Sequence, residues 1–339
     1  MTGERFVHLV DTTLRDGSHA VSHQFTAEQI ATIAAGLDEA GVEYIEVSHG
    51  DGLAGSSFNY GWSAISEEEM LTAAAGAIKK GVLTVLLLPG IGTREDLEMA
   101  IHCGAKAVRV ATHVTEADIA EQHIGMAKRM GLKAFGFLMM CHMAPPEKVV
   151  EQARLFESYG ADVVYVADSA GAMLPDDVRA RVGAVVDAVG VPVGFHAHNN
   201  LTLATANSLA ALEAGAVYLD GTCRGLGAGA GNCQIEALVG VLDRAGYRTG
   251  VDFYKIMDVA EDLVEPIMHR PQVVRNAPFM LGYAGVYGSF LLHAYRAAEK
   301  FSLDPRDILV ELGKRGMVGG QEDMIIDVAY QLAQKRGGA

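Results

Sequence analysis

Two histidines spaced one residue apart, His196 and His198, close an apolar run that begins at Val191. On a β-strand, residues i and i+2 point to the same face, so both imidazoles should leave the end of this strand toward one point. Two imidazoles that face one point suit a divalent metal ion. One histidine alone would more simply be a core residue, but asparagines follow at 199 and 200, and ligating histidines need polar partners.

A carboxylate to complete such a site is found near the start of the chain. An apolar run at residues 6–10 leads into a turn that contains Arg15, Asp16 and His19. Parallel α/β proteins keep their catalytic groups where strands end. Asp16 could instead cap the turn. With the two histidines it forms a set that binds one face of an octahedral ion and leaves positions open for substrate, so we interpret Asp16, His196 and His198 as the metal ligands.

The neighbours of Asp16 suggest acid–base and oxyanion chemistry. Arg15 offers a planar fork that suits a substrate carboxylate or a developing enolate oxygen. Glu46, near the end of the second expected strand, could hold this guanidinium or could form a solvent-facing salt bridge. We interpret His19 as the candidate base, because imidazole titrates near neutrality, and rank His23 and His49 below it.

Three further features have both a functional and a structural interpretation. Asp168-Ser169 follows the sixth expected strand and is either a substrate-contacting loop or an ordinary turn. Tyr283 and Tyr287 would share one face if their segment is helical, and they either pack or project a phenol over the site. The glycine-rich loop 224–232 sits where many barrels hold a phosphate, but we prefer the interpretation that small residues let the backbone approach the metal site.

The order of the elements predicts the α/β class. Short β-branched runs alternate with alanine-rich helical stretches roughly every 25 to 30 residues, the period of a βα unit. Helix starts such as Thr26, Ser66 and Thr93, and glycines before the next strand such as Gly41 and Gly81, favour a closed (β/α)8 TIM barrel over an open sheet. The expected strands are 6–11, 43–48, 82–88, 106–111, 133–139, 162–167, 191–197 and 216–220.

The βα rhythm stops near residue 250, which predicts a second, smaller unit. Helices are expected at 256–268, 289–301, 305–315 and 323–335. We therefore expect a catalytic barrel at 1–250 and a small C-terminal helical domain at 251–339 that packs on it.

Composition excludes several classes of function. The chain has 27 Lys and Arg against 42 Asp and Glu, a net charge of −15, which repels nucleic acid and anionic lipid. Its four cysteines form no paired motif, and its apolar runs are shorter than the roughly 20 residues that a spanning helix needs. We expect a cytoplasmic protein with neither nucleic acid nor membrane as a partner.

The whole chain resembles the 4-hydroxy-2-oxovalerate aldolases, within the barrel metallolyases that include isopropylmalate synthase and HMG-CoA lyase. The motifs that carry this resemblance are Thr12-Thr-Leu-Arg-Asp-Gly-Ser-His19, Ile45-Glu-Val-Ser-His-Gly-Asp-Gly52, Gly55-Ser-Ser-Phe-Asn-Tyr60, Phe195-His-Ala-His-Asn199, Tyr283-Ala-Gly-Val-Tyr287 and Gly319-Gly-Gln-Glu-Asp323.

The resemblance implies a class II aldolase that cleaves a 4-hydroxy-2-oxo acid to pyruvate and a short aldehyde in aromatic or sterol catabolism. It implies a divalent ion, usually Mn²⁺ with Mg²⁺ or Co²⁺ as alternatives, an enolate stabilised by Arg15, and His19 as the base. The 2-oxo acid would meet Ser169 and Tyr287 as well as the metal-site side chains. The implied partner is an acylating aldehyde dehydrogenase, in a heterotetramer that channels the aldehyde and contacts the helical domain.

Two alternatives remain open from the sequence. Within the same fold, the chain could be a Claisen-type acyl-CoA condensing enzyme or a CoA-ester lyase, although such synthases carry a long region after the barrel. From a different class, it could be a non-catalytic metal-binding scaffold, which would leave the polar strand ends without a purpose.

Overall fold

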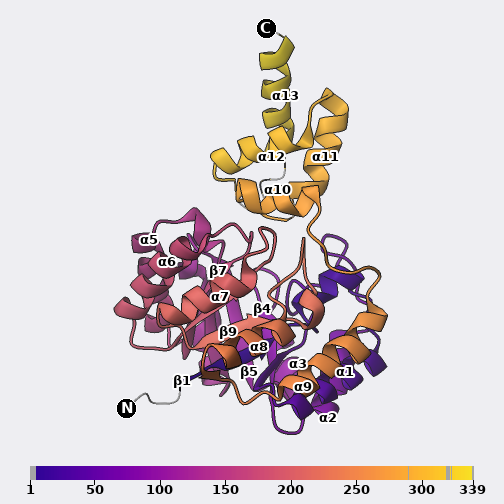
Figure 1. The fold of residues 1–339 in the computed structure, drawn as a ribbon, viewed down its shortest axis with the longest axis vertical. Coiled ribbons are helices and arrows are strands. Elements are labelled where there is room, and N and C mark those ends of the chain that lie inside the picture. The colour runs from indigo at the N-terminus through magenta and orange to yellow at the C-terminus, as the bar shows by residue number, and fades with distance from the viewer. Residues whose placement is uncertain (1–4, 289, 318–320, 322, 338–339) are drawn as a thin grey trace.

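Eight parallel strands form a closed barrel, and a helix lies outside the barrel after each strand (Figure 1). This computed structural model describes residues 5–288, 290–317, 321 and 323–337. The last barrel strand pairs with the first, with His8 opposite Tyr218, and this pairing closes the barrel as predicted. The strands are β2 (His8–Asp11), β3 (Tyr44–Glu46), β4 (Val82–Leu87), β5 (Ala107–His113), β6 (Lys133–Met139), β7 (Val163–Asp168), β8 (Val193–Ala197) and β9 (Tyr218–Gly221).

The helices that follow the strands begin where the capping residues predict. Thr26, Ser66 and Thr93 each open a helix with a capping box, which satisfies two backbone donors. Gly41 ends the first helix at φ +89°, a left-handed position that glycine adopts without strain. The second helix ends at Ala77, before Gly81 is reached, so Gly81 does not have the predicted capping role. The outer helices are α1 (Ala27–Ala40), α2 (Glu67–Ala77), α3 (Arg94–His102), α4 (Glu121–Arg129), α5 (Pro146–Ser158), α6 (Pro175–Ala188), α7 (Ala204–Glu213) and α8 (Ile235–Arg244).

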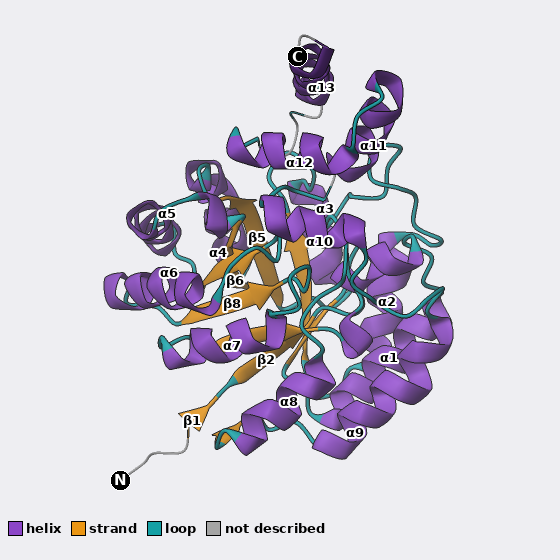
Figure 2. Cartoon of the chain, turned by 45° about the horizontal axis from the view of Figure 1, so that its top comes forward, coloured by secondary structure: helices purple, strands orange, loops and turns teal. Residues whose placement is uncertain are grey.

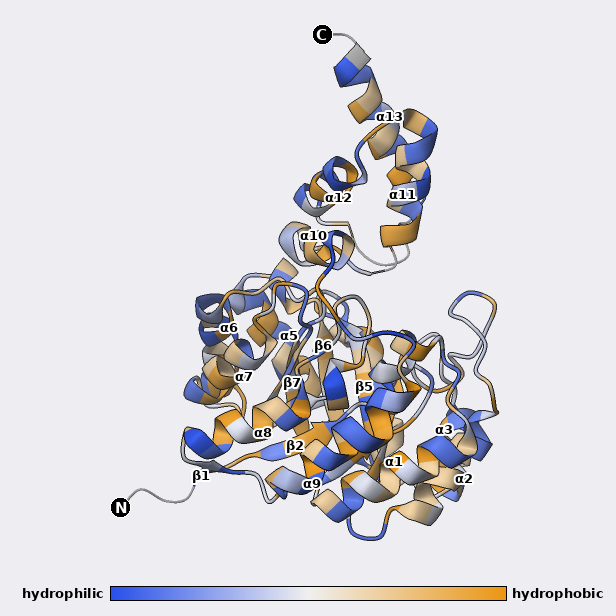
Figure 3. Ribbon diagram, turned by 45° about the vertical axis from the view of Figure 1, so that its right-hand side comes forward, coloured by the Kyte–Doolittle hydropathy of each residue, from blue (hydrophilic) through white to orange (hydrophobic). Residues whose placement is uncertain are grey.

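Two apolar layers stabilise the barrel: one fills its interior, and the other lies between the strands and the outer helices. Figure 2 shows these helices arranged around the strands. The alternation of strand side chains divides residues between the layers, so Leu86 faces the barrel interior while Leu87 packs against the helices. Phe135, Tyr165 and Tyr218 fill the interior with aromatic rings. The helices show both hydrophilic and hydrophobic colours in Figure 3, as amphipathic helices over a buried sheet should.

Beyond α8 the chain is mainly helical, and its first part packs on the barrel. Residues of α9 (Phe253–Asp258) and of the π-helical turn Val259–Val264 join the outer apolar layer. A separate apolar cluster unites α10 (Asn276–Ala284), α11 (Phe290–Phe301), α12 (Pro305–Lys314) and α13 (Met324–Gly337), which stand beyond one end of the barrel (Figure 1). The expected domain division at residue 250 stays a prediction.

Two details differ from the sequence-based expectations, and one motif could not be compared with them. Phe6 does not belong to a barrel strand, because β1 (Arg5–Phe6) pairs with β10 (Tyr247–Arg248) in a separate two-stranded sheet. The expected helix 256–268 is divided by the π-helical turn and a following 3₁₀ turn that ends at Ile267. The motif at 319–323 lies largely outside the described residues.

Asp11, at the end of β2, is a buried carboxyl whose ionisation the fold opposes. Its oxygens accept hydrogen bonds from the backbone and hydroxyl of Thr13 at 2.8 and 2.9 Å, but burial outweighs these bonds and raises the pKa of Asp11 to about 7. The folded-state pKa therefore exceeds the unfolded one of about 4, so the stability that the protonated form contributes is lost as the pH rises from about 4 to about 7.

We expect the unfolding free energy of the wild type, relative to that of Asp11→Asn, to decrease across this pH range. Urea denaturation of both proteins at several pH values measures this difference. A difference that stays constant across the range would show that Asp11 does not titrate as described.

Candidate active site and metal centre

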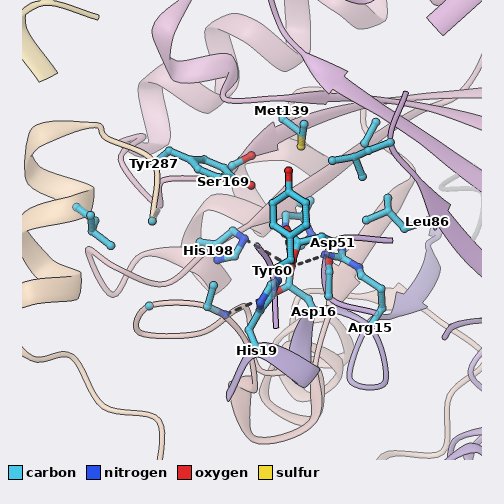
Figure 4. A pocket seen from close by; sticks show the side chains of 18 of the residues that line it. Arg15, Asp16, His19, Asp51, Tyr60, Leu86, Met139, Ser169, His198 and Tyr287 are labelled. Atoms are coloured by element: carbon cyan, nitrogen blue, oxygen red, sulfur yellow. Dashed lines mark hydrogen bonds and ion pairs between the residues drawn. The ribbon is translucent and has the colours of Figure 1, made fainter. Parts of the chain in front are cut away.

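The segments that follow or end β2 and β8 bring the three predicted metal ligands together, and Figure 4 shows two of them, Asp16 and His198, on the cavity wall. Asp16 begins the 3₁₀ helix Asp16–Val21, His196 lies in β8, and His198 follows that strand. Asp16 Oδ2 lies 3.8 Å from His196 Nε2 and 3.7 Å from His198 Nε2. One carboxylate and two imidazole nitrogens at these separations could hold a single ion.

The protonation states of these groups also suit a cation. Burial opposes the charge of Asp16, but Arg15 and the two imidazoles outweigh burial and hold the pKa of Asp16 well below its usual value. Burial lowers the pKa of His198 to about 4, against the attraction of Asp16. At neutral pH the site therefore presents a carboxylate and a neutral imidazole, the forms that ligate metals.

The glycine-rich loop 224–232 packs closely against this site, as the preferred interpretation of its small residues expected. A Cβ on Gly227 would lie 2.2 Å from Asn232 Nδ2 and 3.0 Å from Asp16 Oδ1. Asn232 Nδ2 donates to the Leu226 carbonyl at 3.0 Å, while Asn232 Oδ1 is buried with no hydrogen-bond partner among the described residues. Asn232 pairs with His198 through the backbone, so a buried oxygen that lacks a donor belongs to a residue next to a proposed ligand, which fits a divalent cation in this region.

Arg15 lies between the proposed metal site and the second barrel strand. Its Nη1 donates to Asp16 Oδ2 at 2.8 Å and its Nε donates to Glu46 Oε2 at 2.7 Å. Glu46 is completely buried at the end of β3, so the solvent-facing salt bridge considered for it is wrong. The guanidinium is therefore fixed on two sides while it lines the cavity.

Two buried charged residues of this region, Arg109 in β5 and Asp220 in β9, were not recognised from the sequence. Asp220 Oδ2 accepts hydrogen bonds from Arg109 Nη2 at 2.5 Å and from His196 Nδ1 at 2.8 Å. Both residues stand within apolar strand runs, where an ion is costly to bury. A charged residue within an otherwise apolar strand sequence was the signal that could have identified Arg109 and Asp220.

The three histidines considered for the base occupy different environments. His19 lines the cavity, and its ring centroid lies 4.9 Å from that of His23. His49 accepts the Asp51 N–H and has its other nitrogen 3.1 Å from the Gly61 carbonyl. Burial and then His19 and His49 lower the pKa of His23 to about 3. Both ring nitrogens of His49 are therefore engaged by the backbone. Of the three histidines, His19 is the one that lines the cavity.

The cavity at the barrel mouth has a volume of about 460 Å³, and both polar and apolar side chains line it. Its polar lining includes Arg15, Asp16, His19, His196 and His198, and its apolar lining includes Leu86, Leu88, Ala111, Phe137 and Met139. Ser169 and Tyr287 also line it, and the Ser169 hydroxyl accepts the Met140 N–H at 3.1 Å. The cavity is therefore large enough for a small acid with a polar head and an apolar tail.

The two tyrosines of the C-terminal region do not share a face. Helix α10 ends at Ala284, so the helical spacing that was considered for Tyr283 and Tyr287 is interrupted. Tyr283 is 66% exposed, whereas Tyr287 is turned toward the cavity (Figure 4). Burial raises the pKa of the Tyr287 phenol above its usual value, so this group is a hydrogen-bond donor at neutral pH.

Two family models match most of the chain. The HMGL-like family matches residues 6–263, and the DmpG-like communication domain matches residues 272–334. A 4-hydroxy-2-oxovalerate aldolase of Moorella thermoacetica is 84% identical over 98% of this chain and 99% of its own length. The protein of that name from Carboxydothermus hydrogenoformans is 68% identical over 97% of this chain and 98% of its own.

Solved structures show a related fold at lower identity. The HMG-CoA lyase of Bacillus subtilis superposes with a TM-score of 0.68 at 21% identity and covers 81% of this chain and 98% of its own. The carboxyl transferase domain of Rhizobium etli pyruvate carboxylase, solved with pyruvate and biocytin, gives a TM-score of 0.80 at 17% identity over 98% of this chain and 61% of its own. Among the described helices, none combines the length and the apolar character needed to cross a bilayer.

Proposed function

The chain belongs to the HMGL-like family and, within it, to the 4-hydroxy-2-oxovalerate aldolases, and from this premise we propose that it cleaves 4-hydroxy-2-oxovalerate or a close analogue to pyruvate and a short aldehyde such as acetaldehyde. The observation that carries the proposal is the buried convergence of Asp16, His196 and His198 on the wall of the cavity. This arrangement is the feature that metal-dependent retro-aldol chemistry requires.

The family implies a divalent metal, and we propose Asp16, His196 and His198 as its ligands and Mn²⁺ as the ion, with Mg²⁺ or Co²⁺ as alternatives. When bound, the ion supplies Lewis acidity to the carboxylate and keto oxygens of the 2-oxo acid. Asp16 and His198 are held in ligand form at neutral pH by the charges and burial described above.

The side chains around the ligands carry out the proton transfer and stabilise the developing charge. His19 accepts the proton of the C4 hydroxyl, the C3–C4 bond breaks, and its electron pair moves into the enolate while C4 leaves as the aldehyde. The guanidinium of Arg15 stabilises the developing negative charge on the enolate oxygen, and a proton delivered to C3 completes pyruvate. Because Glu46 and Asp16 fix the guanidinium beforehand, little reorganisation accompanies this charge development.

The rest of the cavity suits the organic part of the substrate. Ser169 and Tyr287 provide hydroxyl groups on the cavity wall, and the Tyr287 phenol can donate to a substrate oxygen. The apolar side chains Leu86, Leu88 and Met139 also line the cavity, and we assign them to the short aldehyde chain. We assign substrate contact to Ser169 and Tyr287, with Tyr287 also orienting the reacting groups.

The C-terminal helices supply the proposed contact with an acylating aldehyde dehydrogenase, most simply in a heterotetramer. The match to a DmpG-like communication domain supports association with such a partner. Large apolar side chains are exposed on this part of the chain, namely Phe279, Tyr283, Leu292, Tyr295, Ile326 and Tyr330. We propose that residues 1–250 form the catalytic barrel and 251–339 the partner-binding unit, in a cytoplasmic protein of aromatic or sterol catabolism.

The test is a pyruvate-release assay on purified protein. A series of 4-hydroxy-2-oxo acids of increasing chain length is supplied with Mn²⁺, Mg²⁺ or a chelator. We expect pyruvate from the five-carbon acid with Mn²⁺ and none with the chelator. Cleavage of acyl-CoA esters without pyruvate release would favour a CoA-ester lyase instead, and inactivity with every acid, with the dehydrogenase present, would favour a non-catalytic scaffold.

A further inference from the structure

Arg109 is the largest side chain that is fully buried in the described part of the protein, and it lies inside the barrel. Its guanidinium carbon sits 4.3 Å from the ring centre of Phe137 and 4.5 Å from that of Tyr165. Arg109 is not part of the cavity wall, so it cannot touch substrate in this arrangement. A buried cation held between two aromatic rings needs a reason beyond packing, because apolar residues usually fill barrel interiors.

The hydrogen bonds of Arg109 connect two separate halves of the site. Its Nη1 donates to Glu46 Oε2 at 3.3 Å, and this same oxygen accepts Arg15 Nε at 2.7 Å. Its Nη2 donates to Asp220 Oδ2 at 2.5 Å, and that oxygen also faces His196 Nδ1 at 2.8 Å. The chain Arg15–Glu46–Arg109–Asp220–His196 thus runs through buried atoms from the enolate-stabilising group to a metal ligand.

The second half of this chain selects one tautomer of His196. A carboxylate only accepts hydrogen bonds, so His196 Nδ1 must be the protonated nitrogen. The lone pair is then on His196 Nε2, which faces Asp16 Oδ2 across 3.8 Å. Asp220 can hold the imidazole in this orientation only while its own position is fixed, and Arg109 fixes it.

We infer that Arg109 is a positioning residue that orients Arg15 and His196 together, through Glu46 and Asp220. The inference deepens the proposed function and rests on it. The forked guanidinium is essential to this role, since two nitrogens reach two carboxylates on different strands. A lysine ammonium is a compact charge on a flexible stem and cannot reproduce the planar fork, so Arg109→Lys keeps the charge but loses the coupling.

The test compares Arg109→Lys with a packing control, Phe135→Leu, which alters the same barrel interior outside the hydrogen-bonded chain. Two quantities are measured: the Mn²⁺ dissociation constant, from free Mn²⁺ by electron paramagnetic resonance, and kcat at saturating Mn²⁺. We expect Arg109→Lys to weaken Mn²⁺ binding and to lower kcat by about tenfold or more each, the usual scale for an outer-shell partner. Phe135→Leu should lower the melting temperature and leave both quantities close to wild type.

A double-mutant cycle tests the coupling itself. Glu46→Gln and Asp220→Asn are combined, and kcat/KM is measured for each single and double variant, first with Arg109 present and then in the Arg109→Lys background. We expect non-additive effects when Arg109 is present and additive effects in the other background. Additive effects in both backgrounds, or an Arg109→Lys protein that behaves like Phe135→Leu, would overturn the inference.

Three possible outcomes are covered, so that a failure of this inference can be distinguished from a failure of the proposed function. If Arg109→Lys does not fold, Asp220→Asn keeps Arg109 and removes one of its partners, and it should weaken Mn²⁺ binding in the same direction. If the wild type releases no pyruvate, the proposed function fails, while the Mn²⁺ dissociation constants still report whether Arg109 positions His196. If Arg109→Lys and Asp220→Asn both bind Mn²⁺ as the wild type does, the inference fails with the proposed function intact.

Discussion

His19→Ala is expected to lower turnover by about 100-fold or more, which is the usual scale for the loss of a general base. The imidazole lines the cavity, and no other residue that lines it was assigned the role of proton acceptor for the C4 hydroxyl. Because His19 is not among the three proposed ligands, the affinity for Mn²⁺ should stay unchanged. Steady-state pyruvate release at saturating Mn²⁺ measures the first quantity, and Mn²⁺ titration measures the second.

His102→Ala is the matched control for this variant, because His102 is an exposed residue of the last turn of α3 and should have no effect. Turnover of His19→Ala near the wild-type level would make the base assignment wrong. His23, whose ring lies next to His19, would then be the next candidate for the general base.

Arg15→Lys is expected to lower kcat by about 100- to 1,000-fold, the scale found when one preorganised oxyanion donor is lost. Lysine can keep the positive charge, but it cannot bond Asp16 and Glu46 while also facing the substrate oxygen. The loss should appear mainly in kcat, because the interaction strengthens as the enolate charge develops. Steady-state kinetics at saturating Mn²⁺ separate kcat from KM.

Arg94→Lys, on the exposed surface of α3, changes the same side-chain type outside the site and should behave as wild type. A loss in Arg15→Lys that is confined to KM would mean that Arg15 only binds the substrate carboxylate. It would then have to be removed from the list of groups that stabilise the enolate.

Much of the barrel could be predicted from local patterns, and the convergence of Asp16, His196 and His198 could be predicted from local patterns combined with the topology of a parallel barrel. Strand periodicity and capping residues are local properties, and the i, i+2 spacing of His196 and His198 determines that both side chains leave one face of a strand. Asp16 could be included because catalytic groups collect at the carboxyl ends of parallel strands. The curated relatives and the closed barrel confirm the family and the fold.

The parts that could not be predicted depend on side chains that are distant in sequence. Arg109 bonds Glu46 across 63 positions and Asp220 across 111, and no spacing rule connects such residues. Tyr283 and Tyr287 illustrate a second limit, since their shared face depended on a helix whose end at Ala284 is set by the left-handed Gly285. Tertiary packing determines the direction in which a buried charged side chain points. This packing cannot be read from the sequence alone.

The most direct measurement is the number and affinity of Mn²⁺ ions bound per chain, in the wild type and in His198→Ala, with His102→Ala as the control. We predict one ion for the wild type and for the control. In His198→Ala the affinity should fall by more than the ~10- to 100-fold that the loss of an outer-shell partner costs. Equal Mn²⁺ affinity in His198→Ala and the wild type would contradict the metal site, and the reaction built on it would have to be abandoned.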